Sequence, residues 1–406
     1  MAGVVLAGVL LVGCGSVPDA GSVPVPSSAP VAAPGSTAAP SSTDGLPSSV
    51  TRVLPTAWER LAASADRLDP VAGYPRSVEG GEATWTTKPV DDWTSGFFPG
   101  ELWLAGRLTG DPAWTARAQR WTAPIAGQVT RTDTHDLGFV VDDSFGAELD
   151  ATGQGAEQVV TAARSLATRY SPTVGAIKSW DTEGDDDKRG SWRFPVIIDT
   201  VMNLPLLDRA AALPGGDPRW KDLATRHALT ASTTNMRPDG SIAHVAVFDP
   251  ASGQLVKRDT WQGAAPDSTW SRGQGWAIHG FAAQARAAGN PELLAAARKA
   301  ADWWLAHTAP GARVPPWDFS RPGEERDTSA AAVAASGLLD LAQQTGDARY
   351  RQVALETLDE LAGRDVAPAG PALLAHAVGG KPQDSEVDVG MVYADYYFLE
   401  AVGRAS

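Results

Sequence analysis

The hexapeptide TGDPAW, from Thr109 to Trp114, combines three signals that end one helix and start another. Glycine readily adopts the left-handed conformation that closes a helix, aspartate caps the next helix, and proline suits its first turn. Three further segments repeat all or most of this pattern: GGDPRW at 215–220, AGNPEL at 288–293 and TGDARY at 345–350. Each segment therefore predicts a tight turn between two helices.

Helical patterns dominate the chain from about residue 51 to residue 406, whereas strand-like alternation is limited mostly to Ser241–Phe248. Twelve helices are predicted, at 53–67, 96–109, 111–127, 136–150, 154–170, 198–213, 217–235, 270–288, 290–308, 327–345, 347–363 and 391–405. The connections after the even-numbered helices are short, and those after the odd-numbered helices are long.

Six helical hairpins with short turns at one end and long loops at the other predict an all-α fold, an (α/α)6 barrel of two concentric helix rings. A linear helical solenoid is the alternative, but the hairpins vary too much in length and sequence for a repeat family. In a barrel, the long loops gather at one mouth, and loops on a rigid scaffold are where functional sites usually lie.

The composition narrows the choice of partners. The chain has 406 residues and a formal net charge of -14, which argues against nucleic acid or an anionic membrane surface as a partner. Any anionic ligand therefore needs local positive groups. Most of the 15 tryptophans are expected to fill the core, but tryptophans in loops offer flat faces that suit sugars.

The N-terminus has the features of an export signal. An apolar run from Val4 to Val12 is too short to span a bilayer and precedes Gly13 and Cys14, the only cysteine. Residues 1–14 therefore resemble a signal peptide with a lipobox in which Cys14 is lipidated, although no basic residue precedes the run. Residues 15–50 are rich in Pro, Ser and Ala and predict a disordered tether. We expect a secreted, cell-surface lipoprotein that meets the membrane only through this anchor, with plain secretion as the alternative.

The segment FPVIIDTVMNLPLL, residues 194–207, contains an acid that its apolar neighbours predict to be buried. Asp199 interrupts an apolar run, and Asn203 follows one helical turn later on the same face. Burial would raise the pKa of Asp199 toward that of a working general acid. His135 and Asp136, in THDLGF, add a second carboxyl group from a neighbouring hairpin. Two carboxyls in different environments suit acid–base chemistry on sugars, but an aspartate at a helix start can also be only a cap.

The sequence contains no motif for metal binding, phosphate binding or serine hydrolase chemistry. The six histidines are scattered, and the sequence has no HExxH, CxxC, phosphate-binding loop or GxSxG elbow. We therefore expect neither a metal nor a cofactor.

Four segments together resemble the unsaturated glucuronyl hydrolases, glycoside hydrolase family 88: HDLGF, IIDTVMNLPLL, DSTWSRGQGWAIHGF and VDVGMVYADYYFLEA. The resemblance extends from about Trp93 to Ala401, and the family has an (α/α)6 barrel. It implies an enzyme that removes a 4,5-unsaturated uronic acid from the non-reducing end of oligosaccharides left by polysaccharide lyases. In that reaction an Asp protonates C4, water adds at C5, and the hemiketal collapses. Asp199 matches this proton donor, and Asp136 matches its charged partner.

The resemblance also implies a set of sugar-binding residues. They are Trp93, His135, Trp180, Asn203, His244, Gln262, Trp270, Arg272 and Trp276. Trp270 and Trp276 could instead be barrel packing, and His244 could be a turn histidine. Arg272 lies at a predicted helix start, where the helix dipole disfavours a cation, and this placement favours a ligand-binding role.

One departure from the family bears on the substrate. Relatives that act on sulfated fragments carry a Ser/Lys-rich segment before the last helix, whereas this chain has GGKPQDSEVDVG at 379–390, with several acids. We therefore expect a preference for unsulfated products. The alternatives are an unsaturated rhamnogalacturonyl hydrolase, an ordinary glucuronidase acting at the anomeric carbon, and a non-catalytic carbohydrate-binding lipoprotein.

Overall fold

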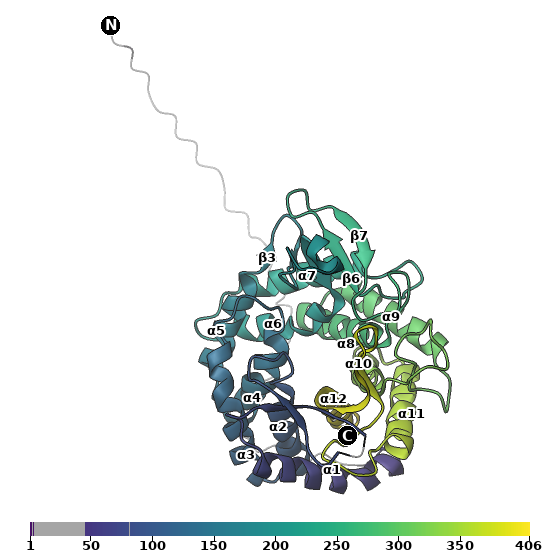
Figure 1. The fold of residues 1–406 in the computed structure, drawn as a ribbon. Helices are drawn as coiled ribbons and strands as arrows, with labels where there is room; N and C mark the ends of the chain where they lie inside the picture. The colour runs from purple at the N-terminus through teal and green to yellow at the C-terminus, as the bar shows by residue number, and fades with distance from the viewer. Residues whose placement is uncertain (2, 4–44, 81) are drawn as a thin grey trace, which may run out of the picture.

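The computed structural model describes residues 45–80 and 82–406, together with Met1 and Gly3 (Figure 1). Cys14, with nearly all of the predicted signal peptide and the predicted tether up to residue 44, lies outside the described residues. The first helix, α1 (Ser48–Arg67), begins five residues earlier than predicted and contains Pro55.

Six helical segments form a closed inner ring (Figure 1). They are α2 (Phe97–Thr109), the π-helical η2 (Gly138–Gly146) with α4 (Ala147–Thr152), the 3-10 helix η4 (Ile198–Met202) with α6 (Pro205–Ala211), α8 (Ser271–Ala288), α10 (Thr328–Thr345) and α12 (Val392–Ala405). Each segment contacts the next, and α12 contacts α2. The (α/α)6 barrel is therefore confirmed, and a linear solenoid is excluded.

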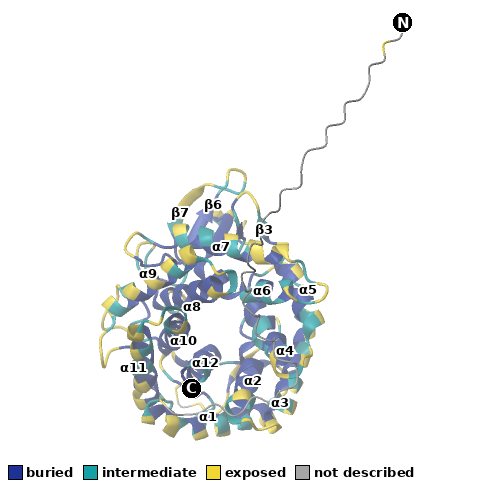
Figure 2. Ribbon diagram, turned by 180° about the vertical axis from the view of Figure 1, so that it is seen from behind, coloured by how far each residue is buried: buried dark blue, intermediate teal, exposed yellow. Residues whose placement is uncertain are grey.

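The outer ring consists of the helices that alternate with the inner segments along the chain. Its members are α1, α3 (Ala113–Thr122, followed by the 3-10 helix η1, Ala123–Gln128), α5 (Ala156–Ala167), α7 (Arg219–Thr234), α9 (Pro291–His307) and α11 (Ala348–Arg364). Every predicted helix has a helical counterpart, with differences at the ends and with a break inside the one predicted at 198–213. The inner helices α8 and α10 are buried along most of their length, because helices cover them on several sides (Figure 2).

The tight turns have the predicted chemistry. Gly110, Gly289 and Gly346 close their helices with φ of 68°, 62° and 68°, in the left-handed region that glycine tolerates. Asn290 then accepts hydrogen bonds from the first amides of α9, and Asp347 does the same for α11. These turns fix the antiparallel pairing within each hairpin.

The long loops contain short antiparallel strands. One sheet has the order β2 (Thr86–Lys88), β1 (Tyr74–Val78), β9 (Ser385–Met391), β8 (Ala377–Gly380), and another has the order β5 (Phe194–Ile197), β6 (Val245–Phe248), β7 (Leu255–Asp259). A small pair joins β3 (Tyr170–Ser171) to β4 (Ala176–Ile177), and two 3-10 turns complete the loops, η3 (Lys188–Ser191) and η5 (Lys381–Gln383). Since both larger sheets join different loops, the long loops meet at one end of the ring, as predicted.

Most of these strands were not predicted. The sequence indicated only the segment that contains β6. Strand β9 pairs with β1 from the opposite end of the chain, with Ser77 opposite Met391. Strand formation depends on such cross-strand neighbours rather than on a local preference, so a single sequence carries little signal for it.

Among the described residues, no helix combines the length and the apolar character needed to cross a membrane.

Close approach between inner helices makes one glycine essential. A Cβ on Gly96, at the start of α2, would overlap the backbone carbonyl of Phe139, whereas a Cβ on Gly106 would only touch Trp114 at 3.4 Å. We expect Gly96→Ala to destabilise the protein by about 1–3 kcal/mol through overpacking. Gly106→Ala in the same helix should be neutral or slightly stabilising, since alanine favours helices. Equal thermal midpoints for the two variants would contradict the packing described here.

Candidate active site

Asp199 lies on a short turn where strand β5 meets the inner ring. It is the second residue of η4, and Pro205 starts α6 as a separate helix. The predicted continuous helix over 198–213 is therefore wrong in one respect: proline suits a first helical turn but has no N–H to continue the preceding one. The break leaves Asp199 on a 3-10 turn that directly follows a buried strand.

Burial gives Asp199 the properties of an acid that holds its proton. Only 14% of its side chain is exposed, and burial raises the pKa to about 7. The positive charge of Arg272 opposes this rise, and the negative charge of Asp136 adds to it. Oδ2 of Asp199 forms no hydrogen bond within the described part of the chain. The indole of Trp276 lies close enough to lower this pKa slightly but does not complete a hydrogen bond.

His244 faces this carboxyl group in a defined tautomer. Its Nδ1 accepts the backbone N–H groups of Trp261 at 3.1 Å and Gln262 at 3.3 Å. Burial, reinforced by the charge of Arg272, lowers the pKa of His244 to about 3, so the ring is neutral. The single ring proton therefore lies on Nε2, which is 3.8 Å from Oδ2 of Asp199.

Asp136 reaches the same region from the loop before η2. Its side chain is 17% exposed, lies 3.3 Å from Nε2 of His135, and accepts the hydroxyl of Thr134 at 2.8 Å. Nδ1 of the buried His135 in turn lies 2.8 Å from the hydroxyl of Thr200, the neighbour of Asp199. A chain of contacts thus leads from Asp136 through His135 to Thr200, the residue next to Asp199, and burial lowers the pKa of His135.

Asn203 joins two neighbouring hairpins. Its side chain is buried, accepts the N–H of Phe139 at 2.9 Å and donates to the carbonyl of Asp199 at 3.4 Å. Gly138 makes room for it, because a Cβ there would lie 2.7 Å from Oδ1 of Asn203. The structure thus places Asn203 and His135 as supports of the two acids, while their contact with a sugar stays a prediction.

Arg272 supplies a fixed positive charge. Its buried guanidinium donates to the carbonyls of Val378 and Gly379 and lies 3.1 Å from a carboxylate oxygen of Asp327. It also lies over the ring of Trp270 at 4.6 Å. The predicted ligand-binding arginine is therefore held rigidly by α10 and by strand β8.

The predicted tryptophans differ in exposure. Trp270 and Trp276 are buried, and Trp276 packs against Phe139 at 5.3 Å as part of the barrel core. Trp93 and Trp180 are only partly buried, and the edge of Trp180 meets His244 at 5.9 Å.

Gln262 and two residues that the sequence analysis did not single out complete the group. Gln262 donates to the carbonyl of Gly379 at 3.2 Å. Arg76 lies over Trp93 at 5.2 Å, and Tyr393 lies 5.2 Å from Arg272. The tyrosine belongs to the resemblance segment at 387–401, which could have indicated it, whereas an arginine in an unpredicted strand gives no signal.

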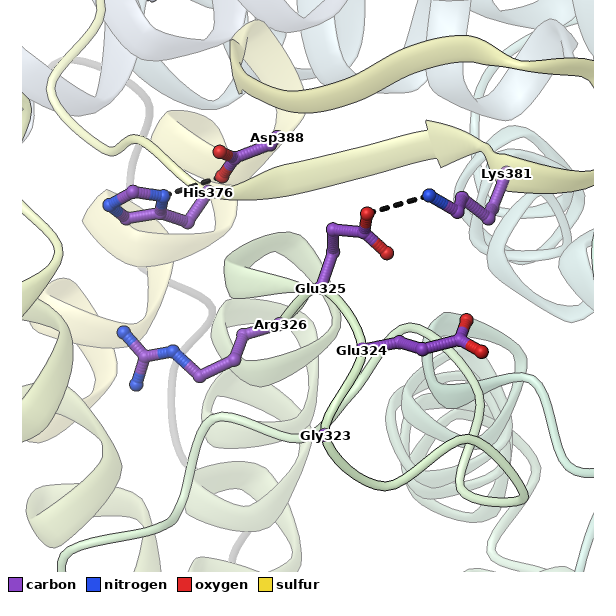
Figure 3. Close-up of a pocket in the computed structure, with 7 residues that line it drawn as sticks. All are labelled: Gly323, Glu324, Glu325, Arg326, His376, Lys381 and Asp388. Carbon is purple, nitrogen blue, oxygen red and sulfur yellow. Dashed lines mark hydrogen bonds and ion pairs between the residues drawn. The ribbon is translucent and has the colours of Figure 1, made fainter.

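A cavity of about 720 Å³ adjoins the site across the β8–β9 hairpin (Figure 3). It is lined by Gly323, Glu324, Glu325, Arg326, His376, Lys381 and Asp388. Lys381 pairs with Glu325 at 2.6 Å, and His376 pairs with Asp388 at 2.6 Å. One wall belongs to the hairpin whose Gly379 carbonyl binds both Arg272 and Gln262. The cavity is thus a neighbour of the candidate site and contains neither Asp136 nor Asp199.

A closed six-hairpin barrel with two acids, a fixed arginine and tryptophans at its long-loop end defines the class of carbohydrate-active hydrolases built on (α/α)6 barrels. No family model matches the chain. Two curated relatives are named unsaturated glucuronyl hydrolase: one from Formosa agariphila is 40% identical over 82% of this chain and 84% of its own, and one from Bacillus sp. strain GL1 is 34% identical over 80% and 89%. The crystal structure of an unsaturated glucuronyl hydrolase specific for heparin matches with a TM-score of 0.82 and 36% identity, over 88% of this chain and 96% of that one. The chain therefore belongs to the unsaturated glucuronyl hydrolase family.

The raised pKa of Asp199 predicts a pH-dependent stability. Between the ordinary value of 3.8 and about 7 the folded protein keeps a proton that the unfolded chain releases, so the wild type loses stability as pH rises through this window. Asp199→Asn removes this loss, and its advantage should grow from zero near pH 4 to about 4 kcal/mol above pH 7, since each pKa unit corresponds to about 1.4 kcal/mol. Thermal unfolding across this pH range measures the difference. The matched variant Asp186→Asn, on an exposed loop, should show no such trend, and a pH-independent difference for Asp199→Asn would contradict the assignment.

Proposed function

We propose that the protein removes a 4,5-unsaturated uronic acid from the non-reducing end of lyase-generated oligosaccharides by hydrating the C4=C5 bond. The observation that carries the proposal is the buried carboxyl of Asp199, whose pKa of about 7 keeps a large share of it protonated near neutral pH. A vinyl ether is a weak base, so its carbon accepts a proton only from an acid that is positioned and shielded from water. The names of the relatives agree with this substrate class.

The steps follow from the roles of the two acids. Asp199 donates its proton to C4, and the positive charge that develops at C5 and the ring oxygen is stabilised by the nearby charge of Asp136. The Asp199 carboxylate then takes a proton from the water that adds at C5. The resulting hemiketal opens to a ketone and releases the neighbouring sugar. The protein's net charge of -14 repels an anionic sugar. The fixed positive charge of Arg272 offsets this repulsion by attracting the carboxylate of the unsaturated sugar.

Exchange of the two acids for amides tests these roles. Asp199→Asn should reduce turnover by at least about 10²–10⁴-fold with the fold intact, because the amide has no transferable proton. Asp136→Asn should leave a measurable residual rate. In a plot of the rate of this variant against pH, the alkaline limb should shift to lower pH, since the Asp136 charge raises the pKa of Asp199. Wild-type turnover should fall above about pH 7. Loss of the ultraviolet absorbance of the C4=C5 bond measures all of these rates.

The site of protonation separates hydration from ordinary glycoside hydrolysis. Reaction in heavy water should place one deuterium on C4 of the released keto-acid. Absence of deuterium at C4, or equal cleavage of saturated glucuronides, would assign Asp199 to protonation of the glycosidic oxygen instead. Complete lack of turnover on glucuronyl and rhamnogalacturonyl lyase products would favour a binding protein.

We also propose that the preferred substrates carry no sulfate on the released sugar. The cavity beside the site holds three carboxylates, and Lys381 and His376 are each paired with one of them. The third basic residue of the lining, Arg326, is paired with Glu360 and Asp365. A sulfate entering this cavity would meet repulsion rather than a free cation.

A matched pair of unsaturated disaccharides, with and without one sulfate, tests this preference. The wild type should favour the unsulfated sugar in kcat/KM. Glu325→Gln frees Lys381 and should lower the ratio of kcat/KM for the unsulfated sugar to that for the sulfated sugar by several-fold. Glu183→Gln, on an exposed loop that does not line this cavity, should leave the ratio unchanged. A wild type that prefers the sulfated sugar would refute this part of the proposal without affecting the assigned chemistry.

For location, we propose a lipid anchor at Cys14, supported by the apolar run from Val4 to Val12 and by Gly13. Cys14→Ser should move the protein from the membrane fraction to the soluble fraction of a bacterial host, with enzymatic activity retained. Membrane association that persists in this variant, or a wild type found only in the cytosol, would refute the anchor.

A further inference from the structure

Helix α9 lies in the outer ring (Figures 1 and 2). A second concave surface lies on the exposed face of this helix. Its cavity measures about 590 Å³ and contains none of the predicted active-site residues. Ala295 and Ala306 lie three turns apart on this face of the helix, and their small side chains keep the groove shallow and open. Asp239, from the turn that follows α7, contributes the opposite wall.

An aromatic pair forms one end of this groove. Trp303 and His307 lie one helical turn apart and stack with ring centres 3.7 Å apart and planes inclined by only 15°. Phe319 supports the pair edge-on, 4.9 Å from Trp303. Nδ1 of His307 donates to the carbonyl of Trp303 at 2.7 Å, which fixes the imidazole ring against the indole. A rigid, partly exposed aromatic stack beside an open groove provides a flat apolar surface for a sugar ring.

Two unpaired cations form the other end. Arg298 and Lys299 lie one turn before the aromatic pair and are exposed, and in the described part of the chain neither forms an ion pair or a side-chain hydrogen bond. By contrast, Arg219 and Arg349 on other outer helices each pair with an aspartate at 2.6 and 2.7 Å. Two free positive charges side by side are notable in a chain whose net charge is -14.

The acids of the groove are engaged elsewhere. Asp302 accepts the hydroxyl of Tyr350 at 2.9 Å and lies 3.6 Å from Arg349. Asp239 accepts the N–H of Ser241 at 3.0 Å and its hydroxyl at 2.7 Å. Both carboxylates of the groove therefore already have hydrogen-bond donors, whereas in the described part of the chain the two cations have no partner.

We propose that this groove is a second carbohydrate-binding site, which holds an acidic glycan chain outside the catalytic centre. A sugar ring would stack on the outer face of the Trp303–His307 pair, while the carboxylate of a uronic acid pairs with Arg298 or Lys299. The site goes beyond the proposed catalytic function, because it needs no unsaturated end and performs no chemistry. It would keep uronate-bearing fragments close to the enzyme.

Calorimetric titration with a saturated hexamer of β-1,4-linked glucuronic acid tests the site, since this probe lacks the double bond. Trp303→Ala should weaken binding by about tenfold or more, equivalent to about 1.4 kcal/mol. Arg298→Gln with Lys299→Gln should weaken it similarly and remove most of its salt dependence. Trp58→Ala, at a partly buried tryptophan elsewhere in the outer ring, should bind like the wild type. Cellohexaose, the matched chain without carboxylates, should bind much more weakly than the acidic hexamer.

Turnover of an unsaturated disaccharide gives the second readout. All of these variants should retain wild-type kcat and KM, which shows that they are folded and that the catalytic centre is untouched. Hexamer affinity equal to that of the wild type in both Trp303→Ala and the double glutamine variant would overturn the proposal. Equal affinity of the wild type for cellohexaose and the acidic hexamer would overturn the assignment to acidic glycans. If Trp303→Ala does not fold, the double glutamine variant alone decides.

Discussion

The arrangement of the site depends on the buried guanidinium of Arg272. A buried cation is stable only when its donors are satisfied, and here they bind two carbonyls of β8 and a carboxylate that caps α10. The same group therefore joins α8, α10 and the β8–β9 hairpin, and its positive charge acts on both Asp199 and His244. Removing it would leave Asp327 buried without its cation and β8 without its attachment to α8.

The two acids show how one fold separates two roles. Asp199 follows a buried strand, and its Oδ2 has no hydrogen-bond partner among the described residues, so it holds its proton. Asp136 lies in a loop with a hydroxyl donor and a histidine beside it. The two acids can keep different protonation states because the histidines near them are neutral. His135 and His244 are both buried, and burial lowers the pKa of each, so neither contributes a full positive charge that would ionise Asp199.

The sequence predicted the barrel because its evidence is local: glycine, aspartate and proline at tight turns act on adjacent residues, and helical periodicity spans one element. It also indicated Asp199, because burying an acid within an apolar run is costly unless the acid is paired or has a function. The strands of the long loops, Arg76 and the supporting role of Asn203 could not be predicted in the same way. Each depends on a partner brought close only by the complete fold, such as Glu386 for Arg76 or the Phe139 amide for Asn203.

The ion pair between Arg76 and Glu386 joins residues 310 positions apart and lies beside Trp93. During synthesis, the first five hairpins can form from local contacts, whereas this ion pair can form only after Glu386, close to the end of the chain, has been made. Contacts of such long range are slow to form and come late. The helical hairpins can therefore form one after another, whereas an incomplete polypeptide would lack both Glu386, the partner of Arg76, and α12, which closes the inner ring.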